Sequence, residues 1–261
     1  MVIVCGTPKG VPHINCSAAF SAFWLDLRRA LRYTAVMRYV VSDIHGEYGL
    51  FCRLLDKIKF SAADELFVCG DMTDKGQESV KLLQCLSAMP NARCLLGNHE
   101  YAFLKYYHSL FRTCRSEEEV LAKLREYFPQ PDGLRLEERD VEWLESLPFF
   151  IEEEEFICVH AGVPLDGSGR IIPPRKVRAE YLMNDRTFMR AETVPKDSKC
   201  VFFGHTPTRN ICNRDMILAY VRDGRVGDRI QDYYKIHLDT GVWMGGILGC
   251  FCVDACDSVY V

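Results

Sequence analysis

The sequence predicts an α/β domain, in which short β-rich runs alternate with amphipathic helical stretches from Tyr39 onward. The β-rich runs are short and continuously apolar, as strands buried on both faces are. The stretches between them repeat apolar residues at helical spacing. The early runs also end in polar loops, and open α/β sheets place their ligands at such strand ends. A binding site is therefore expected at one edge of the sheet.

The first three units follow this pattern in order. Each consists of an expected strand, a polar loop and an expected helix. The strands cover 39–41, 65–69 and 93–96, the loops cover 42–46, 70–76 and 97–100, and the helices include 50–58, 80–86 and 103–107.

The middle of the chain breaks this rhythm. Residues 116–127 and 137–147 are expected helices, joined through a turn at 129–133. This pattern indicates a helical insertion or cap. The charged run 152–155 is expected to be a solvated hairpin or loop.

The strand pattern then resumes. Strands are expected at 156–159 and 200–203, and the tail 235–261 has the pattern of strands punctuated by glycines. We find no internal repeat and no low-complexity linker. The chain is therefore predicted to consist of one domain over 37–261 and an amino-terminal extension over 1–36.

The extension has two interpretations. Residues 20–33 have the pattern of an amphipathic targeting or docking helix. The simpler interpretation, which we favour, is a segment upstream of the working domain, because 37–39 begins a strand directly. The segment 18–25 lacks the order of charges, apolar region and cleavage site of a signal peptide, so secretion is not expected.

The composition is that of an ordinary globular domain. Of the 261 residues, 48% are hydrophobic and 26% are charged, and the net charge is −4. These values argue against disorder, collagen-like repeats and a coiled coil. Scattered lysines and arginines give no broad basic field, so nucleic acid is not expected as a partner. No apolar run approaches the length that spans a bilayer, so no membrane is expected either.

The chain contains 13 cysteines, an odd count without a paired C-x-x-C framework. A reducing cytoplasm is therefore the expected location. The tightest group is Cys250, Cys252 and Cys256, whose spacing does not suit a zinc knuckle. We interpret these cysteines as buried thiols in an expected strand.

Polar side chains gather at the ends of five expected strands. They are Asp43, His45, Asp71, Asp74, Asn98, His99, His160 and His205. Carboxylate, carboxamide and imidazole groups together suit manganese, iron or zinc better than calcium or a thiolate zinc site. Two metal ions need one shared carboxylate, and Asp71 is the natural bridge because it is central in chain order. Turn chemistry explains any one of these residues, but five such loops favour a metal site.

Five motifs in this order resemble the signature of calcineurin-like metallophosphoesterases. They are Ser42-Asp43-Ile44-His45-Gly46, Gly70-Asp71-Met72-Thr73-Asp74-Lys75-Gly76, Gly97-Asn98-His99-Glu100, His160-Ala161-Gly162 and Gly204-His205. The chain most resembles the phosphoprotein phosphatase branch, which includes bacteriophage lambda phosphatase and bacterial serine/threonine phosphatases. The resemblance covers residues 37–261. It implies a β-sandwich flanked by helices, with a dinuclear metal site at the strand carboxyl ends.

The resemblance also implies a role for each site residue. The ligands would be Asp43, His45 and bridging Asp71 for metal one, and Asp71, Asn98, His160 and His205 for metal two. His99 would be the general acid, oriented by Asp74. Lys75, Arg186 and Asn98 would contact the substrate phosphate, and Lys75 stands where the family usually has arginine. Manganese is the expected metal, with iron or zinc as alternatives.

The implied activity is hydrolysis of a phosphomonoester, chiefly phosphoserine or phosphothreonine in a protein or peptide, by in-line attack of a metal-bridging hydroxide. One alternative is a symmetrical bis(5'-nucleosyl)-tetraphosphatase. Another, of a different class, is a non-catalytic pseudophosphatase that binds partners. The tetraphosphatase tends to lack the second Asp of G-D-x-x-D and to have Asp after G-N-H. Asp74 and Glu100 therefore favour the protein phosphatase.

Overall fold

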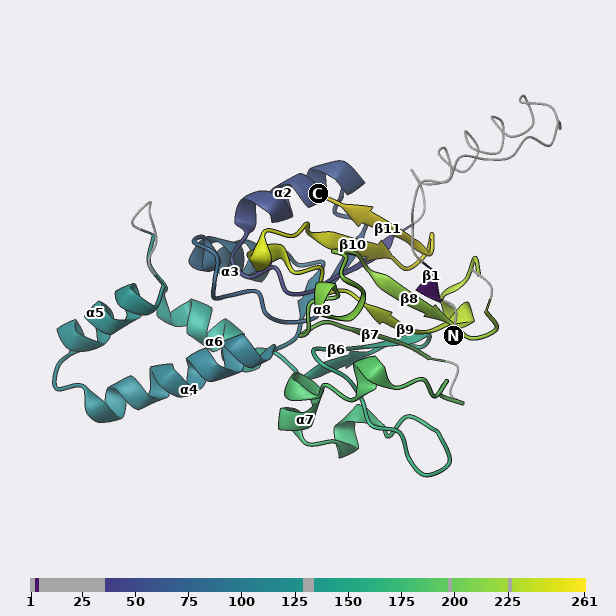
Figure 1. Ribbon diagram of the computed structural model, residues 1–261. Helices are drawn as coiled ribbons and strands as arrows, with labels where there is room; N and C mark the ends of the chain where they lie inside the picture. Colours follow the sequence, from purple (N-terminus) through teal and green to yellow (C-terminus); the bar gives the residue numbers. More distant parts are fainter. Residues whose placement is uncertain (1–2, 5–35, 129–133, 197–198, 225–226) are drawn as a thin grey trace.

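Two β-sheets pack together in the computed structural model, which describes residues 3–4, 36–128, 134–196, 199–224 and 227–261 (Figure 1). One sheet has the strand order β1-β8-β9-β7-β6-β5, and the other has the order β11-β10-β2-β3-β4. The strands of the first sheet are β1 (Ile3–Val4), β8 (Leu218–Val221), β9 (Tyr233–His237), β7 (Cys200–Phe203), β6 (Phe156–Val159) and β5 (Phe150–Glu152). Those of the second are β11 (Asp257–Tyr260), β10 (Gly249–Cys252), β2 (Arg38–Val41), β3 (Glu65–Val68) and β4 (Ala92–Cys94).

An apolar core joins the inner faces of the two sheets. Val40 and Phe67 of the second sheet belong to the same buried cluster as Phe156 and Phe202 of the first. The rings of Phe67 and Phe156 meet edge to face with centroids 5.2 Å apart. Side chains from both sheets thus fill one layer, which confirms the expected β-sandwich.

Helices flank the sandwich, and some of them cover its outer faces. They are α2 (Tyr48–Ile58), α3 (Ser79–Ser87), α4 (Asn98–Thr113), α5 (Glu117–Tyr127), α6 (Glu138–Ser146), α7 (Ala179–Asn184) and α8 (Arg209–Cys212). Val41 and Val68 point away from the central layer and pack with α2, α3, α4 and α6. On the other side, Val159 and Phe203 pack against Leu182 of α7. Strands β6, β7 and β10 are buried along their whole length, so their sequences are continuously apolar.

Parallel pairing brings the polar loops to one edge of the sandwich. β2 pairs with β3, and β3 with β4, in parallel. β6 pairs in parallel with β7 in the other sheet. The loops after β2, β3 and β4 therefore lie beside one another, as do the loops after β6 and β7. This arrangement confirms the strand-end position that the sequence predicts for the site.

The structure moves the end of the third expected strand by two residues, whereas the first two strands shift by one residue at most. A strand is expected over 93–96, but β4 ends at Cys94. The backbone N–H of Leu95 still donates to the carbonyl of Val68 at 3.0 Å, whereas that of Leu96 donates to the carbonyl of Pro148 at 2.9 Å. Leu96 therefore leaves the parallel ladder and turns the chain toward the polar loop that follows.

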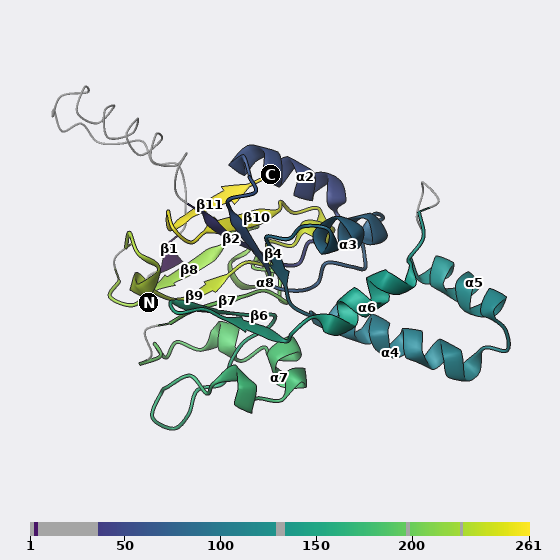
Figure 2. The same cartoon turned by 180° about the vertical axis from the view of Figure 1, so that it is seen from behind.

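The helical insertion forms a projection rather than a cap over the strand ends. Figures 1 and 2 both show α4 and α5 extending away from the sheets. A cavity of about 590 Å³ lies within this projection, among residues that include Phe111, Leu121 and Val141. The expected turn at 129–133 lies outside the described residues. The charged run near 152–155 joins β5 to β6 as an antiparallel hairpin, as expected.

The described part of the extension touches the domain at a sheet edge. Ile3 and Val4 form β1, which pairs antiparallel with β8. The helix expected over 20–33 lies outside the described residues, and the domain boundary at residue 37 stays a prediction. No helix in the described ranges has the length and apolar character to cross a membrane. The described cysteines are free thiols. Cys250 and Cys252 are buried in β10 as expected, but Cys256 is half-buried in the turn that follows β10, not in a strand.

Candidate metal centre

The candidate site is built on unusual backbone. Six of its expected residues adopt the left-handed conformation: Asp43 (φ 53°), His45 (48°), Asp71 (51°), Asp74 (69°), Lys75 (69°) and His205 (71°). Few non-glycine residues occupy this region, and each costs roughly 1–3 kcal/mol. Such residues persist where their surroundings hold them, typically at functional sites. The backbone conformation thus identifies the strand ends as a candidate functional site, independently of the side-chain chemistry.

A buried carboxylate, that of Glu100, holds two of these loops together. Its Oε2 accepts hydrogen bonds from the backbone N–H of Asp71 (2.8 Å) and of Gly97 (3.0 Å). Its Oε1 accepts from the N–H and the hydroxyl of Thr73, each at 2.8 Å. Glu100 is fully buried, so these four donors replace the water that its carboxylate loses. Glu100 therefore fixes the loop after β3 against the start of α4.

Replacing Glu100 with alanine is expected to lower the free energy of unfolding by roughly 3–5 kcal/mol, because it leaves buried donors without an acceptor. Denaturant unfolding followed by circular dichroism measures the change. Glu142→Ala, which removes an exposed carboxylate from α6, is the control and should change stability by less than about 0.5 kcal/mol. Equal unfolding curves for Glu100→Ala and the wild type would contradict the role of Glu100.

Two glycines allow the loops to meet closely. A Cβ atom at Gly97 would collide with the carboxylate and the backbone nitrogen of Asp71. A Cβ atom at Gly204 would collide with the Asp43 carboxylate and the Ser42 hydroxyl. Only glycine permits these approaches, so the motif glycines serve the packing of the site.

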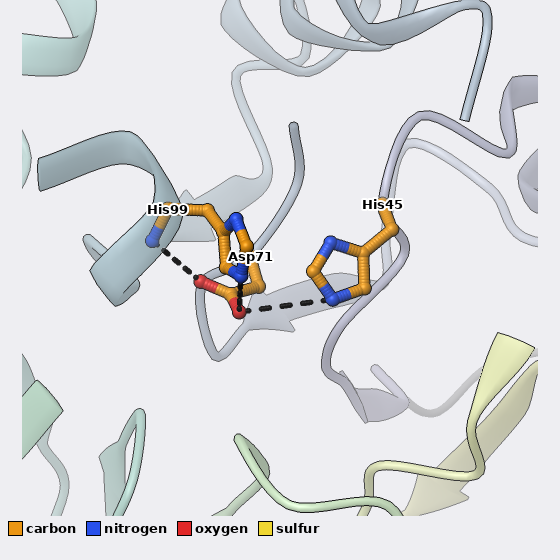
Figure 3. A group of neighbouring side chains, drawn as sticks. All are labelled: His45, Asp71 and His99. Carbon is orange, nitrogen blue, oxygen red and sulfur yellow. Dashed lines mark hydrogen bonds and ion pairs between the residues drawn. The ribbon is translucent and has the colours of Figure 1, made fainter. Parts of the chain in front are cut away.

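The Asp71 carboxylate lies at the centre of the site. Its Oδ2 is 3.7 Å from Nε2 of His45 and 3.8 Å from Nε2 of His99 (Figure 3). Its Oδ1 is 3.3 Å from Nε2 of His160. The first turn of α4 also donates to Oδ1, through the N–H of His99 at 3.1 Å. The two oxygens of one carboxylate thus face different imidazoles, as a bridging ligand requires.

Backbone carbonyls set the tautomers of two histidines. Nδ1 of His45 lies 3.0 Å from the carbonyl of Thr73, and Nδ1 of His160 lies 2.8 Å from that of Cys69. A carbonyl only accepts, so Nδ1–H donates in both rings. When these rings are neutral, their Nε2 atoms carry lone pairs that point toward Asp71, the arrangement seen in metal-binding histidines.

Further acceptors converge on the other side of Asp71. The Asn98 Oδ1 atom lies 2.9 Å from Nε2 of His160 and 2.8 Å from Nδ1 of His205. Burial lowers the pKa of His160, but the carboxylates of Asp71 and Asp43 raise it to about 10. The cluster therefore attracts positive charge, which fits a divalent metal. Its nitrogen and oxygen donors, without thiolate, suit manganese, iron or zinc.

Asp43 also lies in this buried cluster, but its contacts differ from those of Asp71. Its two carboxylate oxygens each lie 3.1 Å from the donating N–H of His205. The Ser42 hydroxyl donates to Asp43 Oδ2 at 2.5 Å. Burial raises the pKa of Asp43 to about 7. Ser42 therefore orients an expected ligand, a role that the sequence did not indicate.

His99 and Asp74 form the pair that the sequence predicts. His99 Nδ1 is 2.6 Å from Asp74 Oδ2, and its Nε2 faces Asp71. Burial lowers the pKa of His99, but the hydrogen bond to Asp74 and the charge of Asp71 raise it above its ordinary value. A histidine held in this way keeps its proton near neutral pH and can donate it.

Two cations flank the cluster. Lys75 lies on the side of His45, because its Nζ atom is over the ring of Trp243 and that ring is next to the His45 ring. Burial lowers the pKa of His205 to about 3, and Arg186 contributes to this shift. Among the described residues, no carboxylate forms an ion pair with Lys75 or Arg186. Both cations are therefore available to an anionic ligand.

Trp243, in the glycine-punctuated tail, also lies at the site, although no role is predicted for it from the sequence. Its ring centroid lies 6.4 Å from that of His45. The Nζ atom of Lys75 lies 3.9 Å from the indole centroid. The sequence signal that could have indicated a role for Trp243 is its position as an aromatic residue between two glycines.

Comparison with known proteins places the chain among phosphoesterases. A family model for calcineurin-like phosphoesterases matches residues 38–238. A relative from Delftia acidovorans, named a symmetrical bis(5'-nucleosyl)-tetraphosphatase, is 35% identical over 132 residues, 48% of this chain and 44% of the relative. One of the same name from Pseudomonas putida is 32% identical over 130 residues, 48% of this chain and 42% of the relative. The chain thus matches less than half the length of these relatives.

Solved structures share the fold. A candidate diadenosine tetraphosphatase has a TM-score of 0.58 at 20% identity, over 87% of this chain and 94% of that chain. A metallophosphoesterase from Sphaerobacter thermophilus has a TM-score of 0.52 at 17% identity, over 87% of both chains. At these identities the likeness concerns the fold alone.

The relatives correct the predicted substrate. The prediction of a serine/threonine phosphatase acting on a phosphorylated protein or peptide is wrong, because the curated relatives are named as dinucleoside tetraphosphatases. The physical reason lies in the two residues that favoured it. Glu100 is buried on backbone donors, and Asp74 holds His99. Neither residue reports the identity of the substrate.

Proposed function

The chain belongs to the calcineurin-like phosphoesterase family, and we propose that it is a metal-dependent hydrolase that cleaves dinucleoside tetraphosphates symmetrically. The relatives of that name support the proposal. One feature of the site carries it: two cations flank the Asp71 cluster, with Lys75 near His45 and Arg186 near His205, and neither forms an ion pair with a carboxylate in the described part of the chain. This spread of positive charge suits a substrate whose negative charge extends over several phosphates.

We assign two divalent metal ions to the cluster. The first would be held by Asp43, His45 and Asp71, and the second by Asp71, Asn98, His160 and His205. Ligand atoms of Asp71, His160 and His205 lie within 4.8 Å of one another, as do those of His45, Asp71 and His99, and Asp43 is added because its carboxylate accepts the N–H of His205. The donor set supports manganese, iron or zinc. Metal ions bound there would neutralise phosphate charge and lower the pKa of water. Membership of the family implies divalent metal ions in general. The narrower choice of manganese, iron or zinc is our proposal from the donor atoms.

The chain's own residues would act on the leaving group and on the phosphates. His99 would donate a proton to the oxygen of the departing nucleoside diphosphate, and Asp74 would keep its ring in position. Lys75 and Arg186 would neutralise charge on phosphates at either side of the reacting one. Asn98 would contact phosphate from the start of α4, where a helix N-terminus favours anions.

A comparison of two substrate classes tests this proposal. We expect kcat/KM for diadenosine tetraphosphate to exceed that for a phosphoserine peptide by at least about 100-fold, because only the dinucleotide reaches both cations. Both substrates are measured with the same protein and the same manganese concentration. A higher kcat/KM for the peptide would contradict the proposal.

A further inference from the structure

An exposed indole lies beside the candidate metal centre. Trp243 is 42% exposed, although large aromatic side chains are mostly buried. Its ring lies next to that of His45, at a centroid distance of 6.4 Å. Exposed aromatic surface at a binding site commonly meets a ligand. Trp243 is therefore placed to contact a ligand that binds at the metal centre.

The turn that carries Trp243 is held in place. It is the 3₁₀ turn Val242–Met244, which lies between Gly241 (φ 70°) and Gly245 (φ 74°). The buried Asp239 carboxylate accepts the N–H of Gly241 at 2.9 Å. Val242 is buried in the core that lies against the second sheet. Because this backbone is fixed, the indole is a preformed surface, which reduces the entropic cost of binding.

Lys75 connects this surface to the phosphate site. Its Nζ lies over the indole, 3.9 Å from the ring centroid. A cation–π contact of a solvent-exposed lysine is weak, whereas a charge-assisted contact with phosphate is strong. A bound phosphate would therefore draw the ammonium group away from the indole. The indole face that Lys75 leaves would then be free for a flat, uncharged group.

We propose that Trp243 is a stacking platform for one nucleobase of the substrate, and that Lys75 moves from the indole to a phosphate when the substrate binds. This inference rests on the proposed function, because it seats a nucleoside at the His45 end of the polyphosphate. Every nucleobase has a π-face, so the platform accepts any base. It discriminates nucleoside polyphosphates from phosphates that carry no base.

Kinetics test the platform. Trp243→Ala is expected to raise KM for diadenosine tetraphosphate about tenfold, equivalent to about 1.4 kcal/mol, with kcat changed less than about twofold. Inhibition by inorganic pyrophosphate, which has no base, should keep its constant within about twofold. Trp243→Phe retains a stacking face and should stay within about threefold of wild type. Phe111→Ala, an exposed aromatic truncation in the helical projection, is the control and should change neither value.

Two results of these kinetics would overturn the platform. An unchanged KM in Trp243→Ala would show that no base stacks there. Equal losses for the dinucleotide and for pyrophosphate would show that Trp243 only positions Lys75.

Indole fluorescence separates this inference from the proposed function. Saturable quenching is expected when AMP is added to the wild-type protein, but not when ribose 5-phosphate is added. The sequence has three tryptophans, so Trp243→Phe identifies the source of the signal and should abolish the AMP response. If the wild type shows this response but hydrolyses no dinucleotide, the platform stands and the proposed function fails. If it hydrolyses the dinucleotide without any AMP response, the platform fails.

Discussion

Replacing Asp71 with asparagine is expected to lower kcat by at least about 1,000-fold and to reduce the bound metal. The reason is geometric, because the two oxygens of Asp71 face His45 on one side and His160 on the other. An amide keeps the shape but removes the charge, and it puts a donor in place of one acceptor. Metal content by elemental analysis and turnover under saturating substrate measure the two effects.

The control for this variant is Asp56→Asn, which removes an exposed carboxylate from α2. It should keep both the metal content and the turnover of the wild type. An Asp71→Asn protein with two tightly bound metals and the wild-type rate would contradict the dinuclear assignment.

Replacing His99 with asparagine is expected to lower kcat by roughly 100- to 10,000-fold while metal content stays near normal, because His99 is assigned to proton donation. Its Nδ1 contact with Asp74 at 2.6 Å leaves Nε2 facing the cluster. The loss should be smaller for substrates with good leaving groups, which need less protonation. Turnover of aryl and alkyl phosphate esters with the same variant gives this comparison.

Asp74→Asn provides a second test of the same pair. It removes the charge that keeps His99 protonated, so it should lower kcat less than His99→Asn does and in the same substrate order. Equal losses for aryl and alkyl esters in His99→Asn would count against the acid role. A loss of metal in that variant would instead make His99 a ligand, since its Nε2 lies as near to Asp71 as that of His45.

The sequence predicts the sandwich edge well because strand pattern and loop chemistry agree there. Val41 and Val68 end apolar runs, and the polar motifs that carry Asp43 and Asp71 follow directly. Parallel pairing then places these loops side by side. Strand β8 is not predicted, although it is as long as the predicted strands β2 and β3.

The roles of single residues are harder to predict, because they depend on distant contacts. Glu100 follows His99 in sequence, yet its partners are the backbone groups of Asp71 and Thr73, more than 25 residues away. Its identity therefore reflects loop packing, and using it to choose a substrate led to the wrong class. Trp243 lies in the connection between β9 and β10, far from His45 in the sequence, and only the fold brings the two rings together.

Product analysis of diadenosine tetraphosphate hydrolysis tests the central claim most directly. The protein is incubated with the dinucleotide and manganese, and the nucleotides are separated by anion-exchange chromatography at early times. Symmetrical cleavage predicts that ADP accumulates at two molecules per molecule of substrate, with no ATP or AMP as initial products, and that Asp71→Asn forms none. Intact dinucleotide after prolonged incubation with the metal-loaded wild type, or equal initial yields of ATP and AMP, would contradict the account.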